Sequence, residues 1–369
     1  MRIIIINLIA NTIGDSLFET PMFAILKKNY PGCYLAVTAS DTSNEMFKNN
    51  PYIDEIIHIP ELSAIGEDIS KFQKTLVYSK VIYELIKYLR KEKFDLAIIT
   101  QPNFWLSHII PFLAGIPYSI GYDYPGAHLK FLLGTKVPFA DPAAYPDRHF
   151  SESNFDLLKP LDVKYTKKDK TILRVVDDEE LAAAKALCEK YQIGNTFICF
   201  QAGAKWKRKQ WAPEKFKELA KLITEKGYKV VLLGSEAEWD LNQTIRGRDS
   251  FITGIFGFQG TSNPNIINLS GRATLSELAG LLKLSKMIIG NDSGLIHLAS
   301  AVGTKSVAIY GTTSLLHSRT MGSGKGVQVF STEALPNKLY MEDAAECEAR
   351  MNSVNVEDVF KAAMGLMKE

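Results

Sequence analysis

The sequence predicts an α/β protein of two doubly wound, Rossmann-like domains whose parallel sheets face a central cleft. A chain of 369 residues is too long for one ordinary hydrophobic core. Continuous apolar runs alternate with helical patterns, which is typical of parallel sheets covered on both faces. The alternation begins again after a lysine-rich stretch, Lys164–Lys170, which we interpret as the linker. We predict domains over residues 1–165 and 166–350, and a C-terminal segment, 351–369, that packs on either one.

In the first half, each expected strand is a short apolar run. These strands are Ile3–Leu8, Tyr34–Thr38, Glu55–Ile59, Leu96–Thr100 and Tyr118–Gly121, and the first should lie at the centre of its sheet. Helices are expected near Met22–Asn29, Thr42–Asn49, Leu76–Leu89 and Phe104–Leu113, and between Pro146 and Pro160. The sequence allows two starting points for the first helix. Either Thr20 caps it with Pro21 in the first turn, or it begins at Ser16 and kinks at Pro21.

The second half repeats this pattern. Strands are expected at Phe197–Gln201, Lys229–Leu233, Ile266–Leu269, Met287–Gly290 and Ser306–Tyr310. Helices are expected at Asp178–Tyr191, Pro213–Lys226, Glu236–Ile245, Thr274–Leu282, Leu295–Val302 and Val356–Met367. Two such domains in series predict a cleft at the carboxyl ends of both sheets.

Composition narrows the class of protein. A net charge of +2 argues against a general nucleic-acid binder. The four cysteines have neither CxxC pairs nor metal-ligand spacing, so we expect reduced thiols and a cytoplasmic protein. No stretch approaches the roughly 20 apolar residues that a membrane span needs.

The most informative turn is Asn291-Asp292-Ser293-Gly294, between an expected strand and an expected helix. Helix N-termini carry unpaired N–H groups and partial positive charge, so this turn is a candidate anion site. Ser293 and Asp292 can act as caps, and His297 falls on roughly the same helix face as Ser293. An ordinary capped turn with a packed histidine is the alternative.

Asp15 follows the first strand in the turn Asn11–Asp15. A carboxylate at this end of a sheet is placed to act as a general base toward a hydroxyl. The alternative is that Asp15 is only a helix cap.

Two turns of the second half complete the candidate site. The first runs from Gly203 and Ala204 to Trp211, and four of its five residues from Lys205 to Lys209 are cationic. These cations could offset the negative charge of a diphosphate. The alternative is a basic loop that is only solvated. Glu236 follows another strand, where it would contact a ribose or favour its own helix N-terminus. The glycines from Gly322 to Gly326 lack the phosphate-loop pattern, and we expect a flexible loop there.

Together these turns resemble glycosyltransferase family nine, the heptosyltransferases of lipopolysaccharide synthesis, which have the GT-B fold. The likeness rests on Gly14-Asp15 with Thr20-Pro21, Ala114-Gly115-Ile116-Pro117 with Gly121, Lys209-Gln210-Trp211 with Pro213, Gly234-Ser235-Glu236, Asn291–Leu295 with His297, and Tyr310-Gly311.

The resemblance implies an inverting, metal-independent transferase with no cofactor. A heptose would pass from an ADP-sugar held by the second domain to a lipid-linked saccharide held by the first, with peripheral contact to the inner membrane. Asp15 would be the base, with Gly14 and Asn103 on the acceptor side. The implied donor-binding residues are Lys209, Glu236, Asp292, Ser293, Gly294, Leu295 and His297, with Gly203, Ala204 and Lys205 in the donor loop.

Three positions depart from the family pattern. Thr12 and Ser119 replace arginines that are common in the acceptor half, and Arg350 replaces a cysteine beside Met351. The sugar and the acceptor therefore stay open. Two other functions also stay open: a sugar-nucleotide epimerase or hydrolase on this scaffold, and a non-catalytic nucleotide-sugar sensor.

Overall fold

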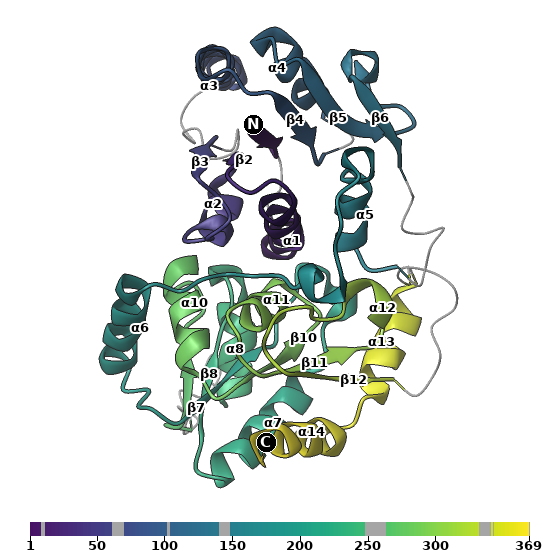
Figure 1. Cartoon of the computed structure of the whole chain (residues 1–369). Coiled ribbons are helices and arrows are strands. Elements are labelled where there is room, and N and C mark those ends of the chain that lie inside the picture. Colours follow the sequence, from purple (N-terminus) through teal and green to yellow (C-terminus); the bar gives the residue numbers. More distant parts are fainter. Residues whose placement is uncertain are drawn as a thin grey trace. The chain divides into compact units, whose positions relative to one another are not determined.

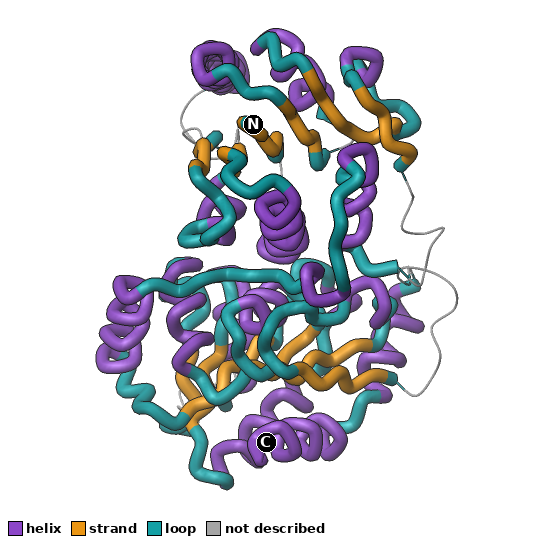
Figure 2. Tube along the Cα trace, viewed as in Figure 1, coloured by secondary structure: helices purple, strands orange, loops and turns teal. Residues whose placement is uncertain are grey.

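The computed structural model describes residues 1–8, 12–60, 70–101, 104–139, 148–247, 263–331, 341 and 343–368. Contacts divide the chain into two compact units. The first unit is Met1–Tyr145 with Phe150–Arg174, and the second unit is Pro146–His149 with Val175–Glu369. Each unit has its own six-stranded sheet, drawn in Figures 1 and 2 with helices on both faces. The predicted α/β class with two doubly wound parallel sheets is confirmed, whereas the central cleft stays a prediction.

The first unit has the strand order β3-β2-β1-β4-β5-β6, and all pairs are parallel. The strands are β1 (Arg2–Ile6), β2 (Tyr34–Ala39), β3 (Glu55–His58), β4 (Leu96–Ile99), β5 (Tyr118–Asp123) and β6 (Thr135–Pro138). The helices are α1 (Ile13–Asn29), α2 (Asp41–Phe47), α3 (Lys71–Glu92), α4 (Trp105–Ala114) and α5 (Ser151–Asp156), with 3₁₀ turns η1 (Lys130–Leu132), η3 (Lys159–Leu161) and η4 (Lys167–Lys170). Four consecutive buried isoleucines, Ile3–Ile6, place β1 at the centre, as predicted.

The second unit repeats this topology in the order β12-β11-β10-β7-β8-β9. Its strands are β7 (Phe197–Gln201), β8 (Lys229–Leu232), β9 (Ile266–Asn268), β10 (Ile288–Asn291), β11 (Ser306–Tyr310) and β12 (Gly326–Phe330). Its helices are α6 (Asp178–Lys190), α7 (Pro213–Glu225), α8 (Trp239–Arg246), α10 (Leu275–Leu284), α11 (Gly294–Ala301), α12 (Leu315–Ser318), α13 (Ala344–Ser353) and α14 (Val356–Lys368), with 3₁₀ turns η5 (Lys207–Lys209) and η6 (Glu236–Glu238).

Helix α1 starts earlier than either predicted start. It begins at Ile13, where the Thr12 side chain accepts a hydrogen bond from the Asp15 backbone N–H. Pro21 lies inside the helix and leaves the Leu17 carbonyl without its usual i+4 donor. The Thr20 hydroxyl takes that role, because its Oγ1 donates to the Leu17 oxygen at 2.7 Å. A local hydroxyl therefore lets the helix continue through the proline.

The predicted linker is part of the first unit. Lys28 on α1 pairs with Asp169 at 2.8 Å, and the Asn29 side chain bonds to Lys164. The chain leaves the first unit only after Arg174, whose Nε donates to the Glu45 carbonyl oxygen at 2.7 Å. These contacts hold the lysine-rich stretch against α1, so the units divide after Arg174 and not after residue 165.

Other differences from the predicted elements lie at edges and turns. Strands β6 and β12 were not predicted, because polar residues interrupt their apolar positions. The helix expected before Pro160 is limited to α5, and the expected flexible loop is packed. Gly322 and Gly324 lie against the backbone of Ser300 and Thr304, and the Gly322 N–H bonds to Ser300 Oγ at 2.9 Å.

The C-terminal helix α14 belongs to the second unit. It packs on α7 and on strands β11 and β12, and its buried residues Val359 and Ala363 join the core of that unit. The preceding helix α13 spans the expected boundary at residue 350. No helix in the described ranges combines the length and apolarity needed to cross a bilayer.

Candidate functional site

The carboxyl ends of β7 and β10 are joined by Asn291, the last residue of β10. Its side-chain Oδ1 accepts a hydrogen bond from the Trp211 backbone N–H at 3.0 Å. Its Nδ2 donates to the Ala202 carbonyl oxygen at 2.7 Å. One buried amide thus fixes the turn after β7 and the end of the basic loop against β10. This is the point where the strand order reverses, which is where doubly wound sheets bind ligands.

Asp292 is the most densely bonded side chain of this region, with 3% of its surface exposed. Its Oδ2 accepts from Lys209 Nζ at 2.7 Å, from Thr313 Oγ1 at 2.8 Å and from Ser318 Oγ at 3.1 Å. His297 Nε2 lies 3.6 Å from its Oδ1. Burial alone would raise the pKa of this carboxyl, but His297 and Lys209 hold the pKa below its usual value. Asp292 therefore stays ionised and organises the turn.

The N-cap residue of α11 is Ser293, one of the two predicted caps, but the expected side-chain capping bond is absent. Ser293 lies in extended backbone there. Its Oγ instead donates to the Gln201 side-chain oxygen. The Ile296 N–H bonds to the Ser293 carbonyl oxygen at 3.2 Å, so within the described residues the N–H groups of Gly294 and Leu295 are the ones that open this turn to another acceptor.

The basic loop combines one anchored lysine with exposed cations. Lys209, at the end of η5, is pinned by Asp292, whereas Lys205 and Lys207 are exposed. Arg208 and Lys209 lie over the Trp206 ring, at 4.4 and 5.4 Å from its centroid. Trp211 is buried, and its Nε1 donates to the Val354 oxygen. Trp211 thus anchors the loop, and Trp206 is half-exposed beside the cations.

Two acids follow β8, and they lie in different surroundings. Glu236, the predicted ribose ligand, lies beside Gly271, where a Cβ would come within 2.8 Å of the Glu236 Cβ. Glu238 faces the turn after β7, because a Cβ on Gly203 would overlap its Oε1. Glu238 also accepts from the Ser235 N–H at 2.7 Å in a capping box. The carboxylate beside the Gly203 turn is therefore Glu238, which the capping-box spacing could have indicated.

Three further partners of the site come from distant segments. Thr313 and Ser318 follow β11, and His149 comes from the short piece that belongs to the second unit. His149 Nε2 bonds to the Arg319 oxygen at 3.0 Å. Burial lowers the pKa of His149 to about 3, and the charges of His297, Arg319 and His317 add to this. We missed all three, because no local motif links them to the turn after β10.

In the first unit, Asp15 lies exposed in the first turn of α1. The cap of this helix is Thr12, which bonds to the Asp15 backbone N–H at 3.1 Å and not to its carboxylate. Gly14 precedes Asp15 in the same turn, and Asn103 lies outside the described residues.

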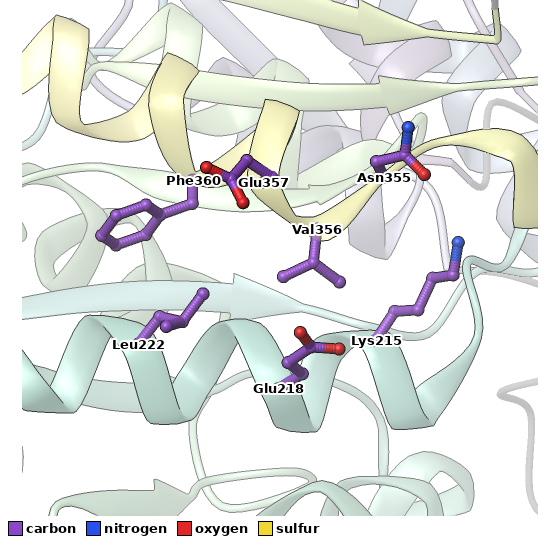
Figure 3. Close-up of a pocket in the computed structure, with 7 residues that line it drawn as sticks. All are labelled: Lys215, Glu218, Leu222, Asn355, Val356, Glu357 and Phe360. Atoms are coloured by element: carbon purple, nitrogen blue, oxygen red, sulfur yellow. The ribbon is translucent and has the colours of Figure 1, made fainter.

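A surface pocket in the second unit is separate from these residues. It has a volume of about 380 Å³ and lies between α7 and α14, as Figure 3 shows. Its lining residues are Lys215, Glu218, Leu222, Asn355, Val356, Glu357 and Phe360. None of the predicted site residues lines this pocket, and it has no part in the site proposed below.

Comparison with known proteins decides the family. The model of glycosyltransferase family 9 (heptosyltransferase) matches residues 82–347, which is more than half of the chain. The chain belongs to this family. The family-9 chain is 27% identical over 304 residues to lipopolysaccharide heptosyltransferase 3 of Escherichia coli, covering 81% of both chains. It is 26% identical over 328 residues to lipopolysaccharide heptosyltransferase 2 of E. coli K12, covering 85% of this chain and 84% of that one.

Solved structures show the GT-B fold of this family-9 chain. Heptosyltransferase II of E. coli superposes with a TM-score of 0.74 at 21% identity, covering 100% of this chain and 99% of that chain. A family-9 transferase from Veillonella parvula gives 0.76 at 19% identity, covering 100% and 97%. E. coli heptosyltransferase WaaC, solved with ADP, gives 0.66 at 15% identity, covering 99% and 100%.

Proposed function

We propose that this family-9 protein is an inverting, metal-independent transferase that moves a heptose from ADP-heptose to a lipopolysaccharide-core or related glycolipid acceptor. The observation that carries the proposal is the open first turn of α11, held beside Lys209 by the buried Asp292 carboxylate. Family membership and the names of the relatives support a heptose and a lipopolysaccharide acceptor. The ADP in the solved relative supports an ADP-sugar donor.

In the proposed reaction the Asp15 carboxylate takes the proton of an acceptor hydroxyl. The freed oxygen attacks the anomeric carbon of the heptose from the face opposite the diphosphate. The bond from that carbon to the β-phosphate oxygen breaks, and its electron pair leaves with ADP. One displacement of this kind inverts the anomeric configuration. Asp15 then loses its proton to water, since its side chain is exposed.

The second unit would stabilise the charge that develops on ADP. The N–H groups at the start of α11 are partly positive, and the Lys209 ammonium is cationic. Both are fixed in place before the donor binds. A free surface lysine would lose rotamer freedom on binding, but Asp292 has already restrained Lys209. Glu238 and Glu236, at the end of β8, are the candidate carboxylates for the nucleoside. Membrane contact would follow from a lipid-linked acceptor at the first unit.

The proposal is tested with ADP-heptose and a truncated lipooligosaccharide acceptor, with products identified by mass spectrometry. Asp15→Asn should lower transfer by about 100-fold or more, because a general base contributes that much. Its affinity for ADP, measured by calorimetry, should not change. Asp162→Asn is the matched control, because Asp162 is exposed in the same unit and has a left-handed φ of 48° that asparagine tolerates.

Other outcomes would contradict the proposal. Wild-type turnover by the Asp15→Asn protein would remove Asp15 as the base. Release of free sugar without an acceptor would favour a hydrolase, and ADP binding without donor consumption would favour a sensor. A thermal-shift panel of ADP-, GDP- and UDP-sugars would identify the preferred nucleotide, since ligands raise the stability of the state that they bind.

A further inference from the structure

The exposed apolar side chains of this protein are concentrated on one part of the first unit. Fourteen large apolar side chains are exposed among the described residues, and nine of them lie on α3, on α4 or in the segment that follows α4. Single exposed apolar residues are ordinary, but a cluster of them marks an interaction site. Six of the nine form the set that we call the apolar face: Phe72, Leu76 and Tyr83 on α3, Trp105 and Phe112 on α4, and Phe131 in η1.

Helices α3 and α4 lie side by side on one face of the first sheet, as Figure 1 shows. Leu85 of α3 and Ile110 of α4 are buried in the same hydrophobic core, against residues of β1 and β4. Arg90 Nη2 donates to the Leu113 carbonyl oxygen at 2.6 Å, which ties the last turns of the two helices together. The 3₁₀ turn η1 packs on α4. The outer sides of these three elements are therefore neighbours.

Helix α3 is apolar on two sides. Phe72, Leu76 and Tyr83 are separated by four and seven residues, so they lie along one side of the helix. All three are exposed. Leu85 and Leu89 lie on the other side and are buried in the core. Packing within the first unit thus accounts for one apolar side of α3 and leaves the other in solvent.

Helix α4 has no lysine, arginine, aspartate or glutamate in its ten residues. Ile110 and Ala114 are buried, whereas Trp105 and Phe112, seven residues apart, are exposed along one side. A helix that is apolar all round ordinarily has an apolar partner on every side. Ten residues are too few to cross a bilayer, which needs about 20. The outer side of α4 therefore fits a surface that the helix lies against.

The charges beside the apolar face are mainly positive. Helix α3 carries six of the fifteen lysines and arginines in residues 1–160, but two of the seventeen acids. Both acids, Glu84 and Glu92, already pair with cations of the first unit, at 3.6 and 2.9 Å. Lys80 and Lys91 are exposed, and no carboxylate among the described residues pairs with either. This side of the first unit therefore offers apolar groups together with unneutralised cations.

We propose that the apolar face is a docking surface for an anionic lipid bilayer. Its aromatic and aliphatic side chains would enter the boundary between headgroups and acyl chains, while the lysines of α3 attract anionic headgroups. The lysines argue against a second copy of this chain as the occupant, because lysine is depleted at protein–protein interfaces and like charges would meet. The inference deepens the proposed function, since it names the surface through which the enzyme reaches a lipid-linked acceptor.

The apolar face begins at the edge of the sheet that carries Asp15. Helix α3 follows β3 and α4 follows β4, and in a parallel sheet such helices start at the carboxyl ends of the strands. Helix α1, with Asp15 in its first turn, starts at the same edge after β1. Phe72 and Trp105 lie in the first turns of α3 and α4. Docking through these residues would bring the bilayer to the edge where the acceptor is proposed to bind.

Docking is measured by co-sedimentation of the full-length protein with vesicles. We expect binding to vesicles of phosphatidylglycerol and phosphatidylethanolamine, and weaker binding to vesicles of phosphatidylcholine. Phe72→Ser/Phe131→Ser should weaken binding by about tenfold or more, because two aromatic side chains no longer leave water. Lys80→Gln/Lys91→Gln should weaken binding to the anionic vesicles by about 25-fold, at about fivefold for each cation near the surface.

Matched controls change exposed residues of the second unit. Phe330→Ser removes an exposed aromatic side chain, and Lys185→Gln/Lys217→Gln removes two exposed lysines. All of these proteins should bind the vesicles as the wild type does. Circular dichroism of every variant verifies that the fold is retained, so that a loss of binding is not a loss of structure.

Trp105 gives a second readout, which reports position. Lipids with brominated acyl chains quench a tryptophan that enters the bilayer, and the chain has four tryptophans. The wild type should be quenched on anionic vesicles that contain these lipids. Trp105→Phe keeps an aromatic side chain and the other three tryptophans, so it should still sediment with the vesicles but lose the quenching. Quenching that persists in Trp105→Phe would place another surface on the bilayer and overturn the inference.

Two further results would overturn it. The first is a wild type that does not bind anionic vesicles, or that binds them no better than both double variants do. The second is a dimer in sedimentation equilibrium that ignores vesicles and that Phe72→Ser/Phe131→Ser converts to a monomer, since the apolar face would then join two copies.

The vesicle assays contain neither donor nor acceptor, so their outcome is separate from the proposed function. A protein that binds vesicles through the apolar face but transfers no heptose would retain the docking surface and remove the transferase proposal. If both proposals hold, Phe72→Ser/Phe131→Ser should keep wild-type turnover on a water-soluble truncated acceptor. The same variant should lose turnover on an acceptor embedded in anionic vesicles, by about the factor that it loses in binding.

Discussion

At the scale of single residues, both units contain a buried carboxyl group, with opposite consequences. Asp292 receives a cation and two hydroxyl groups, so burial does not protonate it. Among the described residues Glu19 accepts from the neutral Asn7 amide, and burial raises its pKa to about 7. The difference lies in the hydrogen-bond and ionic partners and not in the depth of burial, since both side chains are nearly inaccessible to solvent. One holds a turn together, and the other can change its charge near neutral pH.

Asp292→Asn should destabilise the second unit and weaken ADP binding. The substitution leaves the Lys209 ammonium without its buried partner, which costs about 2–3 kcal/mol in the free energy of unfolding. Because the folded pKa of Asp292 lies below its ordinary value of 3.8, its stabilisation is present above pH 4 and is lost as pH falls through the lowered pKa. Urea unfolding at pH 7 should therefore show the full loss. An equal stability of both proteins at pH 7 would contradict this account.

Glu19→Gln should stabilise the first unit at high pH. Between pH 4.5 and about 7 the folded chain keeps the Glu19 proton and the unfolded chain has lost it, so rising pH lowers stability. The loss reaches about 3 kcal/mol above pH 7, from 2.5 pKa units at 1.36 kcal/mol each. Glutamine has no proton to lose, so the variant should exceed the wild type at pH 8 and match it at pH 4.5. Urea unfolding followed by circular dichroism at both pH values measures the difference, and parallel pH profiles would exclude a buried, titrating Glu19.

At the scale of elements, the central strands could be predicted because a run of consecutive apolar residues marks them. Ile3–Ile6 is apolar at every position, and β1 is covered on both faces. Strands β6 and β12 lie at sheet edges. β6 has one buried position and β12 has none, so no apolar run marks them. Helix α1 begins earlier than the sequence predicts, since Pro21 ordinarily ends or begins a helix. The Thr20 bond that compensates for it could not be deduced from the sequence.

The candidate site also has residues that could be predicted from the sequence and residues that could not. The turn after β10 was found because its residues are consecutive, and the Lys209 loop because its charges are adjacent. The hydroxyl groups on Asp292 come from Thr313 and Ser318, which a long segment of chain separates from it. Glu19 was overlooked although it lies four residues from Asp15. Its importance depends on burial beneath Asn7, and burial is a property of the folded chain.

The glycine-rich segment before β12 allows a test of packing against flexibility. A Cβ on Gly322 would lie 2.0 Å from the Ser300 carbonyl oxygen, which is backbone and cannot move aside cheaply. Gly322→Ala should therefore destabilise the chain by about 2 kcal/mol or more, as overpacking of a close contact does. Gly365 lies in α14 with no atom within 4 Å of its Cβ position. Gly365→Ala should stabilise by up to about 1 kcal/mol. Thermal unfolding of both proteins decides between a packed segment and a flexible one, which would tolerate both changes.

At the scale of the whole molecule, the two units use one plan. In each sheet the first strand lies beside the fourth, and the strand order reverses there. The polar candidate residues of each unit lie at this point. In the first unit that point carries Asn7, Gln101 and, behind Asp15, Glu19. In the second unit it carries Gln201, Asn291 and Asp292. The plan gives each unit a polar edge. The Asp292 carboxylate at the second edge is paired with the Lys209 ammonium beside the start of α11, whereas Asp15 at the first edge is exposed.

This division of charge predicts that ADP stabilises only one of the units. Each unit has its own hydrophobic core, so we expect two unfolding transitions. Of the four tryptophans, Trp206, Trp211 and Trp239 lie in the second unit and Trp105 in the first, so Trp105→Phe makes fluorescence report the second unit alone. ADP at about 100 times its Kd should raise the free energy of unfolding of that transition by about 2.7 kcal/mol. The transition of the first unit, followed by the remaining circular dichroism, should not move. Equal shifts of both would place the nucleotide on both units and contradict the assignment of the donor to the second.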